Sequence, residues 1–107
     1  MKVRVTKSSG NVFADFGLPN TAEHSIKADL VLALAARIKS RGLTQTKAAS
    51  LLGLAQSDVS KLLRGHFTGY SYERLFYYLI ALGMKVRIEV SEAKTKKEAR
   101  LELAMTG

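Results

Sequence analysis

The sequence predicts a mostly α-helical protein, a bundle of four to five helices with a short C-terminal strand. Three observations lead to this fold class. Apolar residues recur at helical spacing between residues 20 and 83. Gly53 interrupts that periodicity within a stretch that is otherwise helical. Residues 84–90 then change to alternating apolar and polar side chains, which is typical of a strand.

Length, cysteine content and charge restrict the possible classes of protein. The 107 residues are enough for one domain with a single core. The absence of cysteine excludes disulfides and thiolate chemistry. His24 and His66 have no other metal-binding residues grouped with them, so we expect no metal and no cofactor. We find no membrane span or signal peptide and expect a cytoplasmic protein. The net charge of +8 favours nucleic acid as a partner, although such a charge can also serve only solubility.

Residues 1–19 are expected to form an N-terminal strand and arm. MKVRVT alternates apolar and polar residues, as a short strand does, and residues 8–11 have the composition of a turn. Residues 12–18 should form an irregular arm packed on the core, which Pro19 ends.

Residues 20–83 should form the helical domain. Asn20 followed by Glu23 is a capping-box-like start for a long helix that ends at Gly42. Its buried stripe repeats every four residues, at Ile26, Leu30, Leu34 and Ile38, and is broadened by Val31 and Ala35.

Two shorter helices, separated by Gly53, occupy residues 44–64. Thr44 is the expected cap of the first, and Val59 with Leu62 gives the second an inward stripe. Gly53 can turn the chain with positive φ. This is the spacing of a helix-turn-helix, although an ordinary amphipathic hairpin also shows helical periodicity.

The second of these helices, at about residues 56–64, would be the recognition helix. Glutamine can pair with an adenine edge, and lysine or arginine can reach guanine or phosphate. We predict base contacts by Gln56, Ser57, Ser60 and Lys61. We predict phosphate contacts by Gln45, Lys47, Arg64 and Thr68.

Residues 45–64 resemble the helix-turn-helix of the XRE group, the lambda-repressor-like DNA-binding domains. Residues 10–90 are similar to small prokaryotic regulators related to HigA-type antitoxins. The resemblance implies a DNA-binding repressor that is also the antitoxin of a type II toxin–antitoxin pair, repressing its own operon and holding a RelE- or HigB-like toxin. In that family a glutamine at the place of Gln45 commonly touches a phosphate; an exposed first-turn residue is the alternative.

Ala55 departs from the family pattern. The family usually has Ser, Thr or Asp there to cap the recognition helix. Without that side chain the helix can start later, with Ser57 as its cap and Asp58 near its positive end. The register of Gln56 depends on which start is used.

The recognition helix is followed by a loop and one more helix. Phe67 and Tyr70 should anchor the loop, and Ser71 should cap a helix that ends at Gly83. Leu75, Phe76, Leu79 and Leu82 form its expected buried side, and Tyr72, Tyr77 and Tyr78 make the remaining surface aromatic. Most of that surface belongs to the core or its edge, and a dimer contact is the alternative.

Residues 84–90 read as a strand that needs a partner. MKVRVT could supply one within the chain, or the equivalent strand of a second subunit could; we favour the second subunit, with dimerisation through Val86, Ile88 and Val90. Such a two-fold dimer would place two recognition helices about 34 Å apart. Residues 91–107 form a charged tail that is either disordered or a weak helix with Leu101 and Met105 on one side.

No catalytic constellation appears in the sequence, so we do not expect an enzyme. The leading hypothesis is a dimeric repressor of a palindromic operator in double-stranded DNA. The alternative is a protein-interaction module whose main ligand is a toxin or another protein. RNA binding is disfavoured, because we find no exposed aromatic platform on a sheet.

Overall fold

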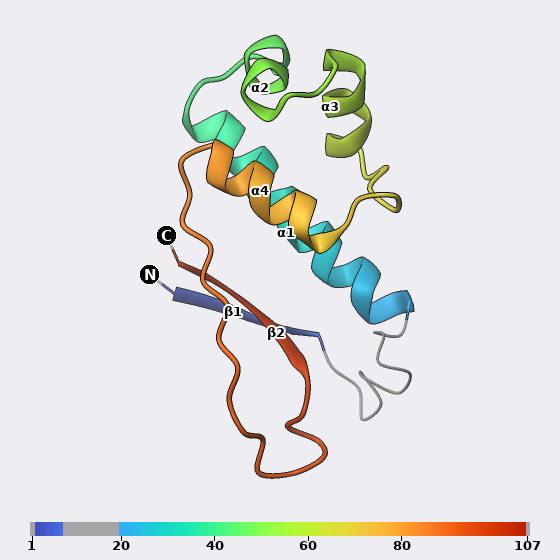
Figure 1. Ribbon diagram of the computed structural model, residues 1–107, viewed down its shortest axis with the longest axis vertical. Helices are drawn as coiled ribbons and strands as arrows, with labels where there is room; N and C mark the ends of the chain where they lie inside the picture. The colour runs from blue at the N-terminus through green and yellow to red at the C-terminus, as the bar shows by residue number, and fades with distance from the viewer. Residues whose placement is uncertain (1, 8–19, 107) are drawn as a thin grey trace. The chain divides into compact units, whose positions relative to one another are not determined.

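The computed structural model describes residues 2–7 and 20–106. Within them lie four helices and two strands, coloured along the chain in Figure 1. They are β1 (Lys2–Lys7), α1 (Asn20–Ser40), α2 (Gln45–Leu52), α3 (Gln56–Leu63), α4 (Tyr72–Ala81) and β2 (Leu101–Thr106). The chain divides into two compact units, of which Lys27–Arg87 is one and Met1–Ile26 with Ile88–Gly107 is the other. The predicted fold class, helical with a short C-terminal strand, is confirmed.

The unit Lys27–Arg87 is built around the leucine stripe of α1. Leu30, Leu34 and Ile38 are buried, as the four-residue repeat predicts. Ala35 is only half-buried, and Ala33 lies in the core instead. The other helices and the loop before α4 complete this core with Ala48, Leu52, Val59, Leu62, Phe67, Leu75, Tyr78, Leu79 and Leu82. Burial of each large aliphatic side chain contributes roughly 1.5–3 kcal/mol.

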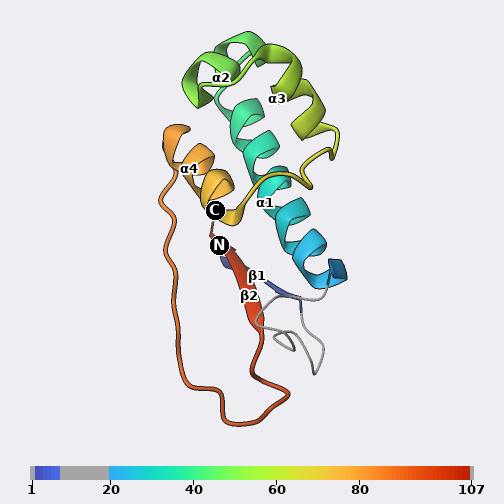
Figure 2. The same ribbon diagram turned by 45° about the vertical axis from the view of Figure 1, so that its right-hand side comes forward.

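Helices α1 and α4 run side by side in the same direction (Figures 1 and 2). Near their starts, Lys27 Nζ lies 5.2 Å from the centre of the Tyr72 ring. Near their ends, Arg37 Nε donates a 2.9 Å hydrogen bond to the carbonyl oxygen of Leu82, which also accepts a 3.1 Å bond from Arg41 Nη1. The two guanidinium groups therefore hold the negative C-terminal end of α4 against α1.

Both predicted hydroxyl caps are present. The Thr44 side chain accepts a hydrogen bond from the Lys47 amide, and the Ser71 side chain accepts one from the Arg74 amide, each at 3.1 Å. Each bond satisfies one of the amides that the first turn of a helix leaves without a partner. The local sequence signals therefore place the starts of α2 and α4 correctly.

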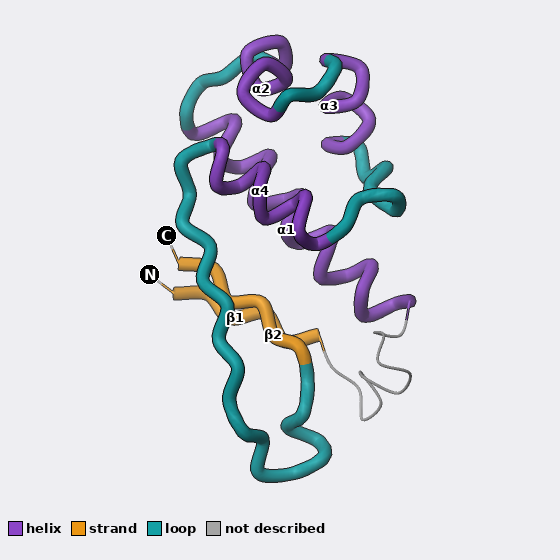
Figure 3. The backbone as a smooth tube through the Cα atoms, in the orientation of Figure 1, coloured by secondary structure: helices purple, strands orange, loops and turns teal. Residues whose placement is uncertain are grey.

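The strand predicted at residues 84–90 is absent, and that prediction was wrong. Residues 84–93 have neither helical nor strand structure, and they lie in the long loop between α4 and β2 (Figure 3). The predicted N-terminal strand does exist as β1, but its partner is β2. A strand requires a neighbour for its amides and carbonyls, and within the described residues the segment 84–90 has none.

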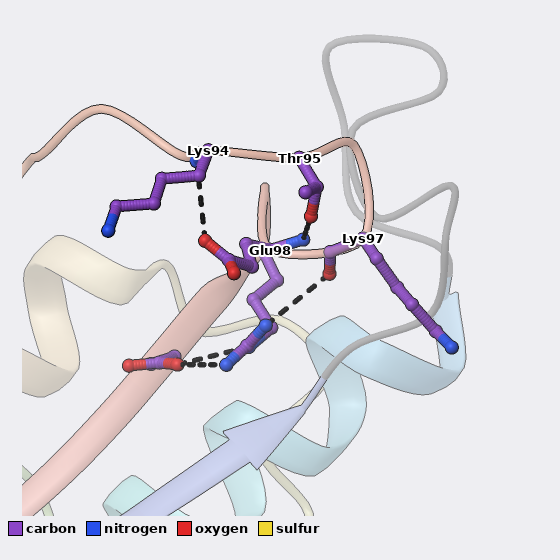
Figure 4. A network of polar contacts seen from close by, with 6 residues as sticks. Lys94, Thr95, Lys97 and Glu98 are labelled. Atoms are coloured by element: carbon purple, nitrogen blue, oxygen red, sulfur yellow. Dashed lines mark hydrogen bonds and ion pairs between the residues drawn. The ribbon is translucent and has the colours of Figure 1, made fainter.

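Within the predicted tail, Leu101–Thr106 forms strand β2 rather than a weak helix, and residues 91–100 belong to the loop before it. β1 and β2 are antiparallel, with Val3 opposite Met105 and Val5 opposite Leu103. The loop before β2 contains a turn in which Thr95 Oγ1 accepts a hydrogen bond from the Glu98 amide, shown in Figure 4. Beyond that turn, Arg100 Nη2 and Glu102 Oε1 form an ion pair at 2.8 Å.

Some predictions concern residues that the structure does not describe. The turn at residues 8–11 and the arm at 12–18 lie outside the described residues, as do the side chains of Asn20 and Glu23. Across the described parts of the chain, no helix has the length and apolarity required to cross a membrane. The same residues contain no group of three His, Cys, Asp or Glu side chains that could hold a metal ion.

Candidate nucleic-acid interface

Helices α2 and α3 form a helix-turn-helix. α2 ends at Gly53, whose φ of 70° and ψ of 30° lie in the left-handed region that glycine adopts without a Cβ penalty. The Leu54 amide then donates a 3.0 Å hydrogen bond to the carbonyl of Ala49 and closes the end of the helix. α3 begins at Gln56, so two residues separate the glycine from the next helix. The two views in Figures 1 and 2 show α2 and α3 next to each other.

The inner side of this motif is fully packed. Ala48, Val59 and Leu62 have no exposed surface, and Ala49 and Leu52 are nearly as buried. The small alanine side chains let the two helices approach closely. α3 is therefore fixed by its apolar side, and its opposite side is left for solvent or a ligand.

The outer side of α3 carries the residues predicted to read bases. Gln56, Ser57 and Lys61 are exposed, as is Arg64 at the C-terminal end of the helix, whereas Ser60 is half-buried. Their spacing of i, i+1, i+4, i+5 and i+8 places all of them on one face. Within the described part of the chain, the side chains of Gln56, Ser57, Lys61 and Arg64 make no hydrogen bond or ion pair. Their polar groups are therefore available to a partner.

The start of α3 settles the alternatives raised by Ala55. Ala55 is the N-cap residue, with φ −69° and ψ 149°, and no side chain provides the capping hydrogen bond. The later start with Ser57 as cap is therefore wrong: Gln56 is the first residue of the helix. Backbone geometry and the buried Val59 and Leu62 define this helix without a hydroxyl cap.

The residues predicted to contact phosphates lie at other points of the motif. Gln45 and Lys47 are exposed in the first turn of α2, and Thr68 is exposed in the loop after α3. The first turn of a helix presents amides and a positive dipole end, both of which favour an anion.

Comparison with known proteins agrees with this geometry. Residues 12–91 match the protein family described as "Helix-turn-helix domain". A solved structure named "Putative XRE Family Transcriptional Regulator" superposes on the chain with a TM-score of 0.72 and 36% sequence identity, covering 78% of this chain and 94% of that one. No curated protein matches the chain. The chain belongs to the XRE-type helix-turn-helix regulators. It is thus a DNA-binding transcriptional regulator.

The basic residues of this XRE-type regulator divide into two groups. Seven of them lie between residues 37 and 74, with only Asp58 and Glu73 as acidic residues. Three are engaged in internal hydrogen bonds: Arg37 and Arg41 with the Leu82 carbonyl, and Arg74 with the Tyr78 hydroxyl. The remaining four, all exposed, are Lys39, Lys47, Lys61 and Arg64. Sequence reasoning did not separate these groups, because the carbonyl that binds Arg37 and Arg41 is more than forty residues away, although Tyr78 is only four residues from Arg74.

An aromatic cluster fixes the loop between α3 and α4 of the regulator. Phe67 is buried, which confirms its expected anchoring role. Arg74 lies 4.4 Å from the centre of the Tyr70 ring and donates hydrogen bonds of 3.1 and 2.7 Å to the Tyr78 hydroxyl. Burial, more than the nearby Tyr78, raises the pKa of Tyr70. Tyr78 itself is buried, so it does not belong to the aromatic surface that the sequence predicted.

The residues predicted to mediate dimerisation lie after α4. Val86 is half-buried, whereas Ile88 and Val90 are exposed. They are outside the helix-turn-helix and belong to the loop shown in teal in Figure 3. The structure contains a single chain, so their role in the regulator remains a prediction.

Proposed function

We propose that this regulator is a sequence-specific repressor that binds its operator as a dimer, with α3 of each subunit in the major groove. The observation that carries the proposal is the division of α3 into two sides. Val59 and Leu62 are completely buried, while Gln56, Lys61 and Arg64 extend into solvent. A helix of this kind, fixed on its inner side and polar and basic on its outer side, suits the major groove.

The base-reading residues would act through their hydrogen-bonding groups. Gln56, in the first turn of α3, can pair with the N6 and N7 edge of adenine. Lys61, one turn further along, can donate to O6 and N7 of guanine. Ser57 and Ser60 can donate or accept, and Ser60 is limited to the part of its side chain that is exposed.

The phosphate contacts would set the position of α3 on the duplex. Gln45 and Lys47 belong to the first turn of α2, where the helix N-terminus also attracts an anion. Arg64 and Thr68 follow α3 along the chain and are exposed. Contacts of this class carry little sequence information, but they make the affinity strongly dependent on salt.

The dimer follows from the requirements of this class of DNA reader. One short helix contacts only a few base pairs, and a two-fold dimer doubles the site when its recognition helices lie about 34 Å apart. A palindromic operator, bound in the cytoplasm, is the natural target. Occupation of that operator would block transcription, including that of the regulator's own gene.

A double substitution tests the assignment of the recognition helix. We expect Lys61→Ala with Arg64→Ala to weaken binding to the upstream DNA, since both charged groups leave the outer side of α3. The matched control is Lys94→Ala with Lys97→Ala, which also removes two positive charges, from the turn drawn in Figure 4. Affinity is measured by mobility shift with unrelated DNA as competitor, and folding by circular dichroism.

The two variants separate specific from general electrostatic effects. The proposal is supported if the α3 variant loses roughly 1–3 kcal/mol of DNA-binding free energy per base contact and the control loses much less. Equal losses would show that the charge of +8 acts only non-specifically. Unchanged affinity in a folded α3 variant would remove α3 from the interface.

A second candidate function is capture of a toxin, as in a type II toxin–antitoxin pair. The observation that favours a protein ligand is the outer side of α4, where Tyr77 is 66% exposed and Ile80 is 53% exposed. Aromatic side chains are enriched in protein interfaces. The test is co-purification with the product of a neighbouring toxin-like gene, for which we expect Tyr77→Ala with Ile80→Ala to reduce binding. Retention of the toxin by that folded variant would exclude this face.

A further inference from the structure

The chain leaves α3 through a tight turn at residues 67–70. The Tyr70 amide donates a 2.9 Å hydrogen bond to the carbonyl of Phe67, which closes the turn. Thr68 and Gly69 are its two central residues, and both are exposed. The turn therefore presents Thr68, a proposed phosphate contact, at its tip.

The first end of the turn is fixed by burial and by the recognition helix. Phe67 is only 4% exposed, so its ring belongs to the core. Immediately before it, the His66 amide donates a 3.0 Å hydrogen bond to the carbonyl of Lys61 in α3. This end of the turn is thus attached to the helix that carries the base-reading residues.

The second end of the turn is fixed by Arg74 from α4. The guanidinium carbon of Arg74 lies 4.4 Å from the centre of the Tyr70 ring. Nε and Nη2 of the same group donate hydrogen bonds of 3.1 and 2.7 Å to the Tyr78 hydroxyl. The rings of Tyr70 and Tyr78 meet edge to face, with their centres 6.1 Å apart. Arg74 therefore joins the half-buried Tyr70 to the buried Tyr78.

The guanidinium group of Arg74 is held in this place by what it would lose on leaving. Tyr78 is 5% exposed, and within the described residues its hydroxyl receives its hydrogen bonds from Arg74. Withdrawal of Arg74 toward a DNA phosphate would leave that buried hydroxyl without a partner, which is unfavourable. Tyr70 would lose its cation at the same time. The geometry thus favours retention of Arg74 on the protein when DNA binds.

We propose that Arg74 is a positioning residue of the DNA interface. By holding Tyr70 against Tyr78 it fixes the turn at residues 67–70, and with the turn the hydroxyl of Thr68 that contacts a phosphate. The inference rests on the proposed phosphate contact of Thr68 and names the residue that places it. Arg74 itself does not touch DNA.

Removal of one buried oxygen tests this role without changing any charge. Tyr78→Phe deletes the hydroxyl that holds Arg74, and its burial keeps that oxygen away from DNA. We expect Tyr78→Phe and Thr68→Val each to weaken operator binding by roughly two- to tenfold, the range of one hydrogen bond. In the double variant the second change should cause no further loss, since both changes act on the same contact.

A phosphate contact outside the turn provides the matched control. Lys47 is exposed in the first turn of α2 and is also proposed to contact phosphate. The losses caused by Lys47→Gln and Tyr78→Phe should add in full, because the two changes are independent. A general loosening of the fold would not distinguish Lys47 from Thr68. Affinities are measured by mobility shift on operator DNA, below the unfolding temperature of every variant.

A second variant separates positioning from direct contact. Arg74→Gln changes an exposed residue and should weaken operator binding as Tyr78→Phe does. It should leave the slope of log K against log salt concentration unchanged, whereas loss of a direct phosphate contact lowers that slope by about 0.9. Lys94→Gln, which removes one exposed positive charge from the turn in Figure 4, corrects for the change in net charge.

Each outcome decides the inference. A loss in Tyr78→Phe that is coupled to Thr68 and additive with Lys47, together with an unchanged salt slope for Arg74→Gln, supports it. Full additivity with Thr68, undiminished binding by the folded Tyr78→Phe and Arg74→Gln variants, or a lower slope for Arg74→Gln overturns it.

The proposed function is decided separately. If Thr68→Val binds the operator as the unmodified protein does, the inference fails, and the variant that combines Lys61→Ala with Arg64→Ala still tests recognition by α3. If the unmodified protein binds no DNA specifically, the proposed function is rejected, and the inference with it.

Discussion

At Gly83 the backbone adopts a φ of +88°, and a Cβ built there would lie 3.1 Å from Arg37 Nη2. A side chain is therefore unfavourable for two reasons, the left-handed conformation and the close guanidinium group. We expect Gly83→Ala to lower the free energy of unfolding by about 1–2 kcal/mol from the conformation alone, with a further loss if Arg37 is displaced from the Leu82 carbonyl. Urea denaturation followed by circular dichroism measures the change.

Gly69 provides the matched control for this residue. It lies in the loop before α4, and a Cβ there would meet nothing within 4 Å. Gly69→Ala should therefore leave the unfolding midpoint nearly unchanged. Equal destabilisation by the two substitutions would mean that the position after α4 has no special requirement for glycine.

Helix α3 begins without a capping side chain, whereas α2 and α4 each begin with a hydroxyl cap. Ala55 already has the extended backbone of an N-cap residue, so a hydroxyl introduced there can accept an amide hydrogen bond without rearrangement. We expect Ala55→Ser to raise the free energy of unfolding by about 1 kcal/mol. Thermal and urea denaturation should both show the gain.

The control for this prediction is the reverse change, removal of a capping hydroxyl, made at the start of α2. Thr44→Ala removes the hydrogen bond to the Lys47 amide. It should lower the free energy of unfolding by a similar amount, roughly 0.5–2 kcal/mol. A folded Ala55→Ser variant whose unfolding midpoint is lower than that of the unmodified protein would show that the added hydroxyl is not accommodated at the turn.

Helix ends could be read from the sequence because their signals are local. Thr44 and Gly53 act on amides and carbonyls within a few residues of themselves. Strand pairing is different, because it depends on which distant segment is available. Leu101 and Met105 are four residues apart, a spacing that fits both a helix face and alternate positions of a strand. Only the pairing with β1 decides between them.

At the scale of the whole molecule, the candidate interface was predictable and the use of the charges was not. The outer residues of α3 follow from helical periodicity once Val59 and Leu62 are placed inside. Arg37 and Arg41 look equally suitable for DNA in the sequence, yet both donate hydrogen bonds to the Leu82 carbonyl. That carbonyl is more than forty residues away, and no local pattern relates it to α1.

The salt dependence of DNA binding distinguishes these two groups of charges. Each phosphate contact contributes about 0.9 to the slope of log K against log salt concentration. We expect Lys47→Gln and Arg64→Gln each to lower the slope, because both residues are proposed to contact phosphate. We expect Arg37→Gln to leave the slope unchanged while reducing stability, because its guanidinium binds a carbonyl. Binding isotherms at several salt concentrations, below the unfolding temperature of every variant, provide the slopes. A reduced slope for Arg37→Gln would mean that this arginine also reaches DNA, and the division of the basic residues into structural and DNA-binding groups would then be wrong.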